Sequence, residues 1–425
     1  MKGIMKAQVF YEPYVMKYED VPIPELRADQ VLIRVKACGI CGSDNAYYRG
    51  KSPLETPTGK GPQILGHEFS GEVAELGEIP AKLGVFRVGE RVTVNPVQSC
   101  GACYHCLRGQ TNMCENGGGL GASSDGAFAE YAVTKYQNLF KMPDDLGFLQ
   151  ASLAEPLACG TYGVMNMGIR TGDTAAVIGP GPIGSMMVRM IKAAGASLVL
   201  LIGSRDYRLE AGKAFGADVL INTVDKDSPY YVADLVGKVS EITHGRMIGR
   251  VITATASPVA MQQALDISSK GSTVVFFGLP GEQDEVHVPA LKSIFADKTI
   301  RFSWLAPSSW PIATQALFTK MLDPTPLITH TFPLKDLIEA LDFVYERREK
   351  VMKAVIVPEM GTACREWGDG RTTCAGGPAD SRDLCRPGPG GAQACSATHR
   401  DPARAALLEP GRGDGDPRRG RDGHP

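Results

Sequence analysis

Three residues near the start of the chain have side chains that can bind one divalent metal together. Cys41 is followed about two dozen residues later by the adjacent pair His67 and Glu68. A thiolate, an imidazole and a carboxylate suit zinc, and three protein ligands leave a fourth position for water or substrate, as in catalytic sites. Cysteine and histidine are also common as buried structural residues, so the rest of the chain must decide between the two interpretations.

A loop of 15 residues contains a second and more specific cluster, in which all four candidate ligands are cysteines. Its members are Cys100, Cys103, Cys106 and Cys114. Four thiolates at this spacing can complete a tetrahedral site that leaves no position open to substrate, which indicates a structural zinc. An iron–sulfur cluster also takes four cysteines and is the alternative, whereas four free thiols in an exposed cytosolic loop would oxidise.

Glu155 stands directly before Pro156, where a helical stretch is predicted to begin. Its carboxylate has two interpretations. It either complements the positive end of the helix dipole in the first turn, or it supplies a second carboxylate to the metal at Cys41 and His67.

A glycine-rich turn follows the predicted strand 174–178 and opens an apolar helix that runs to about residue 194. A further strand is predicted at 197–202, so the turn lies inside a strand–helix–strand unit. In that context the pattern Gly-x-Gly-x-x-Gly indicates a dinucleotide-binding site, because glycines let the backbone approach a pyrophosphate at the helix N-terminus. The candidate cofactor-binding residues of this turn are Gly179, Gly181, Pro182, Ile183 and Gly184.

The end of the strand 197–202 bears on the choice of nucleotide. It is followed by a glycine, Ser204 and Arg205, rather than by the carboxylate that usually holds a free ribose 2′-hydroxyl. Ser204, Arg205 and Arg208 offer groups that suit a 2′-phosphate, so we expect NADP to be favoured over NAD. The alternative is that both arginines are solvated surface residues and that Asp206 turns in to bind NAD.

Two patterns of predicted elements surround these residues. Up to about residue 157, short β-type runs separated by Gly and Pro, including an alternating run at 126–133, indicate a β-rich and partly barrel-like domain. After about residue 173, strands at 218–221, 250–253 and 273–277 alternate with helices, which indicates a doubly wound parallel sheet. The fold class is therefore α/β.

The last part of the chain divides into two segments of different composition. Residues 298–358 mix a strand, two helices and a terminal strand, and we expect this segment to return and complete the first domain. Residues 361–425 contain no Ile, Val, Phe, Tyr or Lys, so they cannot bury enough apolar surface to order themselves. Their four cysteines are irregularly spaced, which argues against a third metal site.

The composition excludes several classes of protein. The chain has 425 residues, a formal net charge of -2 and 43% hydrophobic residues, as expected for a globular protein of at least two domains. This charge provides no positive field for nucleic acid, and no apolar run is long enough to span a bilayer. Without a signal-peptide core, we expect a cytoplasmic protein whose 11 cysteines are metal ligands or free thiols.

The motifs occur in an order that resembles one known family. Gly-Ile-Cys41-Gly-Ser-Asp, Gly-His67-Glu68, the four-cysteine loop, Glu155-Pro-Leu and the glycine-rich turn follow one another along residues 1–358. In this order they resemble the zinc-dependent medium-chain alcohol dehydrogenases. Within that family the chain looks most similar to the sorbitol (polyol), galactitol-phosphate and threonine dehydrogenases, which have a Glu-Pro motif where liver-type enzymes have a cysteine ligand.

The resemblance implies a fold and a set of boundaries. It implies a GroES-like, β-rich catalytic domain over 1–157 with both zinc sites, and a Rossmann dinucleotide-binding domain over 158–297. Residues 298–358 would complete the catalytic domain, and 359–425 would be a disordered tail. Relatives are commonly dimers or tetramers, so a homo-oligomer is expected by analogy.

The resemblance also implies roles for the candidate metal ligands. Cys41 and His67 would bind the catalytic zinc, with Glu68 as the expected third ligand. Glu155 would be a direct or a water-mediated partner of the metal, so the choice of third carboxylate between Glu68 and Glu155 stays open.

Three further residues receive roles by the same resemblance. Ser43 would pass the substrate proton outward, Asp44 would orient His67, and Tyr47 would line the substrate pocket. The implied chemistry is hydride transfer between a zinc-bound alkoxide and NAD(P).

Two departures from the family pattern bear on the substrate, which would be a small alcohol or ketone. Ala46 stands where many relatives have a histidine, and Leu305 stands where sorbitol-type enzymes have an arginine. We therefore expect a secondary alcohol of polyol, sugar or cyclitol type. The alternatives are an amino-alcohol such as threonine or an aminocyclitol, and a nucleotide-binding relative without turnover.

Overall fold

The computed structural model describes residues 2–359, 364–366 and 372–374. Within the tail that was predicted to be disordered, β17 (Cys364–Glu366) pairs antiparallel with β18 (Thr372–Cys374). Glu359, the first residue of the predicted tail, is also described, and its carboxylate forms an ion pair with Lys36 at 2.9 Å. The remaining residues of that prediction lie outside the described part of the chain. Among the described residues, no helix combines the length and the apolar composition needed to cross a membrane.

Two β-sheets form the first part of the fold. The larger has the order β15-β16-β3-β5-β6-β8, with β7 paired to β3, and the smaller has the order β2-β1-β4. Their strands are β1 (Ile4–Glu12), β2 (Val15–Pro22), β3 (Gln30–Gly39), β4 (Gln63–Ile64), β5 (Glu68–Leu76), β6 (Arg91–Val94), β7 (Tyr131–Lys135), β8 (Leu139–Lys141), β15 (Ile328–Pro333) and β16 (Lys353–Val357). Large apolar side chains such as Phe10, Leu32 and Phe69 are fully buried in the core between them.

The last strand of this sheet brings a distant part of the chain to the first metal cluster. β16 pairs antiparallel with β3, with Val355 opposite Gly39 and Ile356 opposite Cys38. Ile40 N then donates a hydrogen bond to the Ala354 carbonyl at 3.0 Å. Residues 353–357 therefore lie directly beside the segment that leads into Cys41.

The six-stranded sheet is parallel throughout, with the order β11-β10-β9-β12-β13-β14. Its strands are β9 (Thr174–Ile178), β10 (Leu198–Gly203), β11 (Val219–Asn222), β12 (Ile248–Thr253), β13 (Ser268–Phe276) and β14 (Thr299–Phe302). β14 continues the sheet from Thr273 opposite Thr299 to Phe276 opposite Phe302. The sheet therefore extends past the boundary that was expected at residue 297.

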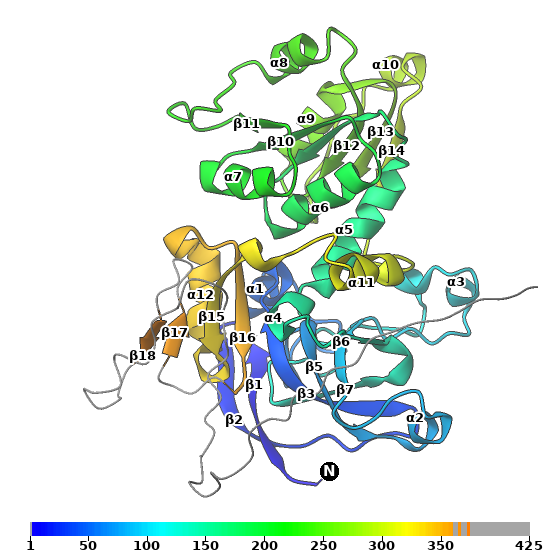
Figure 1. Cartoon of the computed structure of the whole chain (residues 1–425), viewed down its shortest axis with the longest axis vertical. Helices are drawn as coiled ribbons and strands as arrows, with labels where there is room; N and C mark the ends of the chain where they lie inside the picture. The colour runs from blue at the N-terminus through cyan, green and yellow to red at the C-terminus, as the bar shows by residue number, and fades with distance from the viewer. Residues whose placement is uncertain (1, 360–363, 367–371, 375–425) are drawn as a thin grey trace, which may run out of the picture. The chain divides into compact units, whose positions relative to one another are not determined.

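Helices cover both faces of the parallel sheet (Figure 1). One face packs against α5 (Ala154–Met167), α6 (Pro182–Ala193) and α7 (Asp206–Ala214). The other face packs against α8 (Leu235–Ile242) and α9 (Pro258–Asp266). This arrangement explains why the central strands are apolar on both sides.

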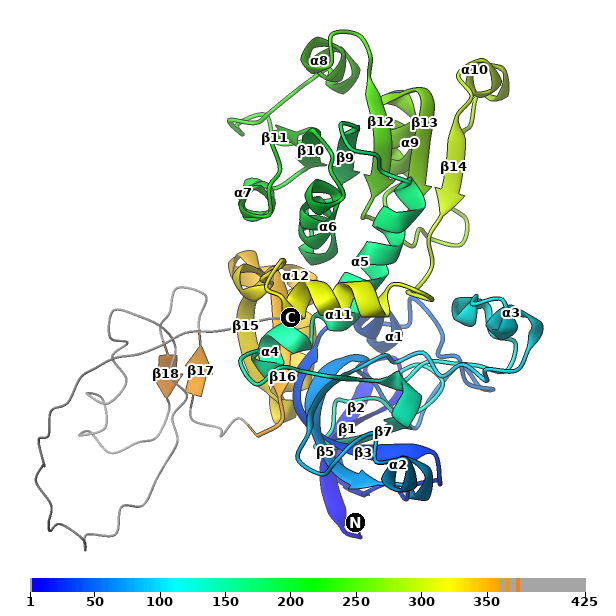
Figure 2. The same ribbon diagram turned by 45° about the vertical axis from the view of Figure 1, so that its right-hand side comes forward.

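The remaining helices of the described chain have four to ten residues. They are α1 (Gly42–Tyr48), α2 (Glu78–Leu83), α3 (Tyr104–Leu107), α4 (Phe148–Ala151), α10 (Ala290–Phe295), α11 (Trp310–Phe318) and α12 (Leu337–Glu346), with short 3-10 turns at Thr111–Met113, Tyr136–Asn138, Thr325–Leu327, Leu334–Asp336 and Arg348–Lys350. Figure 2 shows α11 beside α5, where Ser309 Oγ donates to the Ala158 carbonyl at 2.6 Å. This contact fixes the start of α11 against the first half of α5.

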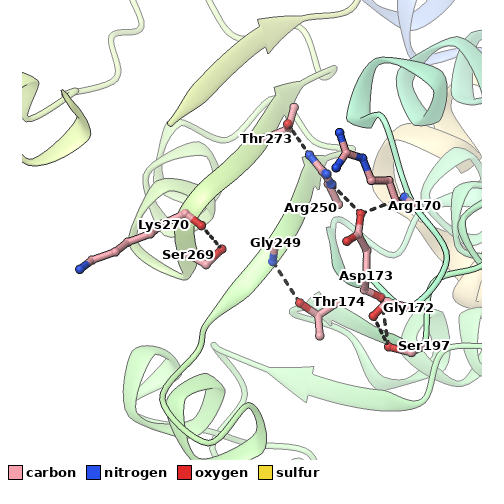
Figure 3. A network of polar contacts seen from close by, with 10 residues as sticks. All are labelled: Arg170, Gly172, Asp173, Thr174, Ser197, Gly249, Arg250, Ser269, Lys270 and Thr273. Carbon is pink, nitrogen blue, oxygen red and sulfur yellow. Dashed lines mark hydrogen bonds and ion pairs between the residues drawn. The ribbon is translucent and has the colours of Figure 1, made fainter. Parts of the chain in front are cut away.

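A polar network ties together the starts of three neighbouring strands of the parallel sheet (Figure 3). Asp173 Oδ2 accepts from Arg250 Nε at 2.8 Å and from the Arg170 backbone N–H at 2.9 Å. Arg250 Nη1 also donates to Thr273 Oγ1 at 2.8 Å. Asp173 directly precedes β9, whereas the glycine-rich turn directly follows β9. The network and the turn therefore lie at opposite ends of this strand.

Candidate functional site

The structure brings the first three candidate metal ligands together. Cys41, His67 and Glu68 each offer a ligand atom, and these atoms all lie within 4.8 Å of one another. Cys41 comes from the junction of β3 and α1, and Glu68 is the first residue of β5, directly after His67. Cys41 and His67 are half-buried whereas Glu68 is buried, so the cluster is accessible from one side.

The start of α1 explains this convergence. Cys41 is the N-cap, and its backbone N–H donates to Asp44 Oδ2 at 2.8 Å while its side chain accepts from the Asp44 backbone. Asp44 Oδ1 accepts from Gly66 N at 3.3 Å and lies 3.7 Å from His67 Nδ1. One buried carboxylate therefore holds both the cysteine and the loop that carries the histidine.

Gly66 gives that loop its shape. Its φ is +90°, in the left-handed region that favours glycine, and an added Cβ would lie 2.9 Å from the ring of Phe128. The next residue, His67, is thereby directed towards Cys41.

Charge around the metal-free cluster favours protonated His67. Burial lowers the pKa of His67, but the neighbouring Asp44 carboxylate and Cys41 raise it by more, and the net pKa is well above the usual value. Burial also raises the pKa of Asp44, and the charge of His67 offsets part of this increase. A metal that binds here must displace a proton from the imidazole, so its binding depends on pH.

Lys353 is part of this site and was missed in the sequence analysis. Its ammonium forms an ion pair with Glu68 Oε2 and donates to the Ile40 carbonyl at 2.9 Å. The exposed fraction is 6% for Lys353 and 1% for Glu68. A single lysine at the start of an otherwise apolar strand was a usable signal, because a buried lysine requires an anionic partner.

Glu155 lies near the cluster without joining it. Its carboxylate is buried and Oε1 accepts a hydrogen bond from Cys159 Sγ at 3.1 Å. Burial raises the pKa of Glu155, and the nearby His67 acts to lower it. Glu155 supplies no atom to the group of ligand atoms that lie within 4.8 Å of one another. Cys159 was also missed in the sequence analysis. It follows Glu155 by four residues in a predicted helix, a spacing that places two side chains side by side.

Two further residues with predicted roles lie on α1. Ser43 is half-buried in the first turn, two positions after Cys41. Burial, with further contributions from Glu55, Asp44 and Cys41, raises the pKa of Tyr47 to about 12. The phenol therefore stays protonated at neutral pH and can donate a hydrogen bond to a bound hydroxyl.

The four-cysteine cluster also forms as a compact group. The ligand atoms of all four cysteines lie within 4.8 Å of one another. Cys100 Sγ and Cys106 Sγ are 4.0 Å apart, and Cys103 Sγ and Cys114 Sγ are 3.9 Å apart. Backbone N–H groups of Ala102 and Cys103 point at Cys100 Sγ and lower the pKa of this thiol to about 6.

The donor sets of both clusters fit zinc. Four sulfur atoms at these separations suit a closed tetrahedral site, whereas one sulfur, one nitrogen and one carboxylate suit a site with an open position. The left-handed conformations of Gly101 and Gly109, with φ of +73° and +75°, let the short loop close around the four sulfurs.

The glycine-rich turn has the geometry of a phosphate cradle. Gly179 has φ +116°, and a Cβ on Gly184 would lie 2.0 Å from the Gly179 carbonyl oxygen. Gly181 is the N-cap of α6 with no side-chain acceptor, and a Cβ there would meet no atom within 4 Å. Pro182 and Ile183 form the first turn of this 12-residue helix, so a pyrophosphate could approach its positive end.

Three guanidinium groups gather at the end of β10. Partial burial lowers the pKa of Arg205, and the like charges of Arg347 and Arg208 lower it further. Arg208 Nε donates to Tyr207 Oη at 2.9 Å. The preceding residue, Ser204, is half-buried.

The nearby carboxylate has other partners. Asp206 Oδ1 accepts from Asn222 Nδ2 at 2.8 Å and from Ser228 Oγ at 2.7 Å. These contacts turn the carboxylate of Asp206 towards the residues after β11. It is therefore not free to rotate towards a ribose without losing two hydrogen bonds.

Comparison with known families gives two matches, one before and one after residues 145–181. Residues 27–144 match the alcohol dehydrogenase GroES-like domain, and residues 182–319 match the zinc-binding dehydrogenase domain. Together these matches include the Cys41, His67 and Glu68 cluster, the four cysteines and the residues after the first glycines of the turn.

Comparison with individual proteins extends over most of the chain. It is 31% identical to the sorbitol dehydrogenase of Bacillus subtilis over 361 residues, which cover 83% of this chain and 97% of that protein. It is 33% identical to the L-threonine 3-dehydrogenase of Bacillus velezensis over 361 residues, 84% of this chain and 100% of that protein. A zinc-binding dehydrogenase of Sinorhizobium meliloti 1021 bound to NADP has a TM-score of 0.76 and 28% identity, with 84% and 100% covered.

Proposed function

The chain belongs to the zinc-dependent medium-chain alcohol dehydrogenase family, and from this premise we propose the residues and the substrate class through which it acts. The family membership makes it a zinc-dependent oxidoreductase that transfers hydride between a secondary alcohol and NAD(P). The observation that carries the assignment of residues is the convergence of Cys41, His67 and Glu68 within 4.8 Å.

We assign two zinc ions to the chain. Cys41, His67 and Glu68 would hold the catalytic ion, with Glu155 as a buried neighbour that acts through water. The four cysteines from Cys100 to Cys114 would hold a structural ion. Bound zinc would act as a Lewis acid that lowers the pKa of an alcohol, while bound nicotinamide would take up or give the hydride.

The remaining steps fall to side chains of the chain itself. Asp44 keeps His67 oriented through the contact at 3.7 Å and fixes Cys41 through its backbone N–H. The Ser43 hydroxyl, half-buried in the first turn of α1, would take the substrate proton and pass it towards solvent. The protonated phenol of Tyr47 would donate to a substrate hydroxyl and so fix the orientation of the carbinol carbon.

We propose a polyol, sugar or cyclitol as the substrate. A protonated Tyr47 beside the metal cluster favours a ligand with a second hydroxyl that can accept its hydrogen bond. The absence of an ionisable side chain at Ala46 speaks against the threonine alternative, in which a histidine would be expected at this position. The sorbitol dehydrogenase relative agrees with this class.

We propose NADP as the preferred cofactor. Arg205, Arg208 and Arg347 place positive charge at the end of β10, while Asp206 is held by Asn222 and Ser228. A 2′-phosphate would relieve the repulsion between these guanidinium groups, which the hydroxyl of NAD cannot do. The Ser204 hydroxyl would add a further hydrogen bond.

We also propose that the protein is a homo-oligomer that associates through the edge of the parallel sheet. β14 pairs with β13 on one side and with no described strand on the other. Phe302 on this strand is 79% exposed, and Phe295 and Ile294 on the neighbouring α10 are 77% and 71% exposed. An apolar edge of this kind suits an identical copy, because a two-fold axis pairs the same strand with itself.

The cellular location in this proposal is the cytoplasm. The four-cysteine cluster needs thiols that stay reduced, which is the normal state in that compartment. The partner in the reaction is a small-molecule alcohol or ketone.

A substrate panel tests the proposed function. Zinc-loaded protein is mixed with NADP or NAD and with polyols, sugars, cyclitols, aminocyclitols or threonine, and reduced nicotinamide is followed by its absorbance. We expect turnover with the first three classes and a higher kcat/KM with NADP. Turnover confined to threonine or an aminocyclitol would contradict the substrate class. Silence with both zinc sites filled and nucleotide bound would contradict the proposed activity.

A further inference from the structure

The ion pair between Lys353 and Glu68 lies directly behind the proposed zinc site. Lys353 is the first residue of β16, a strand whose next three residues are fully buried. Its ammonium contacts Glu68 Oε2 and the carbonyl of Ile40. Ile40 is the residue just before Cys41. One lysine thus touches the segments that carry two of the three candidate ligands.

Gly39 leaves space for this ion pair because it has no side chain. A Cβ on Gly39 would lie 2.4 Å from Glu68 Oε2 and 2.9 Å from Lys353 Cε. No other residue type fits at this position of β3 while the pair keeps its place. The glycine, the lysine and the glutamate therefore form one unit at the point where β16 joins β3.

The charge of Lys353 acts on the whole site. Besides Glu68, which Lys353 contacts, the carboxylates of Asp44 and Glu155 are also buried near the cluster. Before zinc binds, several acidic groups are thus crowded around one buried cation. Leaving a buried carboxylate without a cation is strongly unfavourable, so the metal-free site depends on this lysine.

We propose that Lys353 is a positioning residue that holds Glu68 in place before the metal arrives and competes with the metal for its carboxylate afterwards. Glu68 Oε2 contacts Lys353, and in this proposal Oε1 would bind the metal. This inference rests on the proposed zinc site. It goes further because Lys353, which is not a candidate ligand, would control how tightly Glu68 binds zinc.

The two roles of Lys353 have linked consequences. Without the ammonium, Glu68 loses its ion-pair partner, so metal binding stabilises the fold by more than in the wild type. By linkage, the same protein must bind zinc more tightly by the same free energy. A merely structural ion pair would stabilise the fold equally with and without zinc.

The experiment compares wild type with Lys353→Met by thermal unfolding, with the structural zinc kept and the catalytic zinc either present or removed. Zinc content is measured for each sample. We expect Lys353→Met to lower the Tm of the metal-depleted protein by roughly 5–10 °C, and that of the loaded protein by less than half as much. Competition with a chromogenic chelator should show about tenfold tighter zinc binding in the variant.

Two further variants keep the test decisive. Lys353→Met combined with Glu68→Gln removes both charges, so it should recover the metal-depleted Tm even if Lys353→Met alone does not fold without zinc. Lys298→Met is a matched control, because its half-buried ammonium donates to the Leu265 and Ser268 carbonyls, on residues that supply no candidate ligand. This control should lower Tm by the same amount in both zinc states.

Two results would overturn the inference. An equal loss of Tm with and without zinc in Lys353→Met, with unchanged zinc affinity, would reduce the pair to a structural contact and leave the proposed function intact. A wild-type protein that takes up only the structural zinc would overturn both this inference and the proposed function.

Discussion

The backbone N–H of Cys41 donates a hydrogen bond to Asp44 Oδ2 at 2.8 Å. Because the other oxygen of Asp44 faces Gly66 N and His67 Nδ1, this carboxylate connects the two halves of the candidate zinc site. The first turn of α1 thus sets the distance between a cysteine and a histidine that are far apart in the sequence. In the proposed zinc site, the charge of Asp44 would also make His67 a stronger ligand.

Asp44→Asn should therefore weaken zinc binding without breaking the fold. The amide oxygen can still accept from Cys41 N, but the negative charge beside His67 is lost. We expect the affinity for the catalytic zinc to fall about 10-fold to 100-fold, measured by competition with a chelator. Asp125→Asn is the control, since Asp125 also accepts a backbone N–H, from Ile64 at 3.0 Å, outside the zinc site. Unchanged zinc affinity in Asp44→Asn would refute this role.

Arg205→Ala should change the choice of nucleotide. A charge-assisted hydrogen bond contributes about 1.5–3 kcal/mol, so we expect the Kd for NADP to rise about 10-fold to 100-fold. The Kd for NAD should change by less than about threefold, because NAD has no 2′-phosphate. Arg246→Ala, at an exposed position of the same domain, is the control. An equal loss of affinity for NADP and NAD would show that Arg205 does not bind the 2′-phosphate.

Phe302→Glu should disrupt association through β14. A charge placed on an exposed apolar edge opposes pairing with a second copy. Light scattering after size exclusion should give a mass above the 45.4 kDa monomer for the wild type and a shift towards the monomer for the variant. Val259→Glu, on α9 at 68% exposure, should leave the mass unchanged. A monomeric wild type, or a variant of unchanged mass, would count against this surface.

The network at Asp173 should make stability depend on pH in the acid range. Burial raises the pKa of Asp173, but the hydrogen bonds from Arg250 and from the Arg170 backbone lower it by more, so its pKa in the folded protein lies below 3.8. A lowered folded pKa contributes stability that is complete above 3.8 and is lost as the pH falls through the folded value.

Asp173→Asn should therefore lower the free energy of unfolding at pH 7, by about 2 kcal/mol for a partly buried pair. Urea unfolding at several pH values should show that the difference from wild type shrinks below pH 3.8. Asp266→Asn, whose carboxylate accepts an exposed hydrogen bond from Gln262, should show little difference at any pH. A difference for Asp173→Asn that stays constant down to pH 3 would contradict the assigned shift.

Local patterns were sufficient to predict most of the parallel sheet and two groups of candidate ligands that lie close together in the structure. The strand predicted at 174–178 coincides with β9, because an apolar run before a glycine-rich turn has few other interpretations. The four cysteines lie within 14 residues of one another along the chain, so their convergence needs only a local loop. Cys41 and His67 converge through Asp44, whose place in the first turn of α1 is also a local feature.

Features that depend on the pairing of strands far apart in the sequence could not be predicted from local patterns. The ion pair of Lys353 with Glu68 exists because β16 pairs with β3, and no short-range pattern reports that pairing. The alternating run 126–133 was expected to be one strand, but β7 begins only at Tyr131. Gly126, Ala127 and Phe128 instead donate backbone hydrogen bonds to the carbonyls of residues 64–66, directly before the candidate ligand His67.

The most direct test of the account is the zinc content, turnover and NADP affinity of Cys41→Ser beside wild type and Cys103→Ser. We predict two zinc ions per chain in the wild type. Cys41→Ser should retain the structural ion alone, lose all detectable turnover and bind NADP as the wild type does. Cys103→Ser should lose the structural ion and stability. Wild-type turnover by Cys41→Ser would contradict the proposed zinc site.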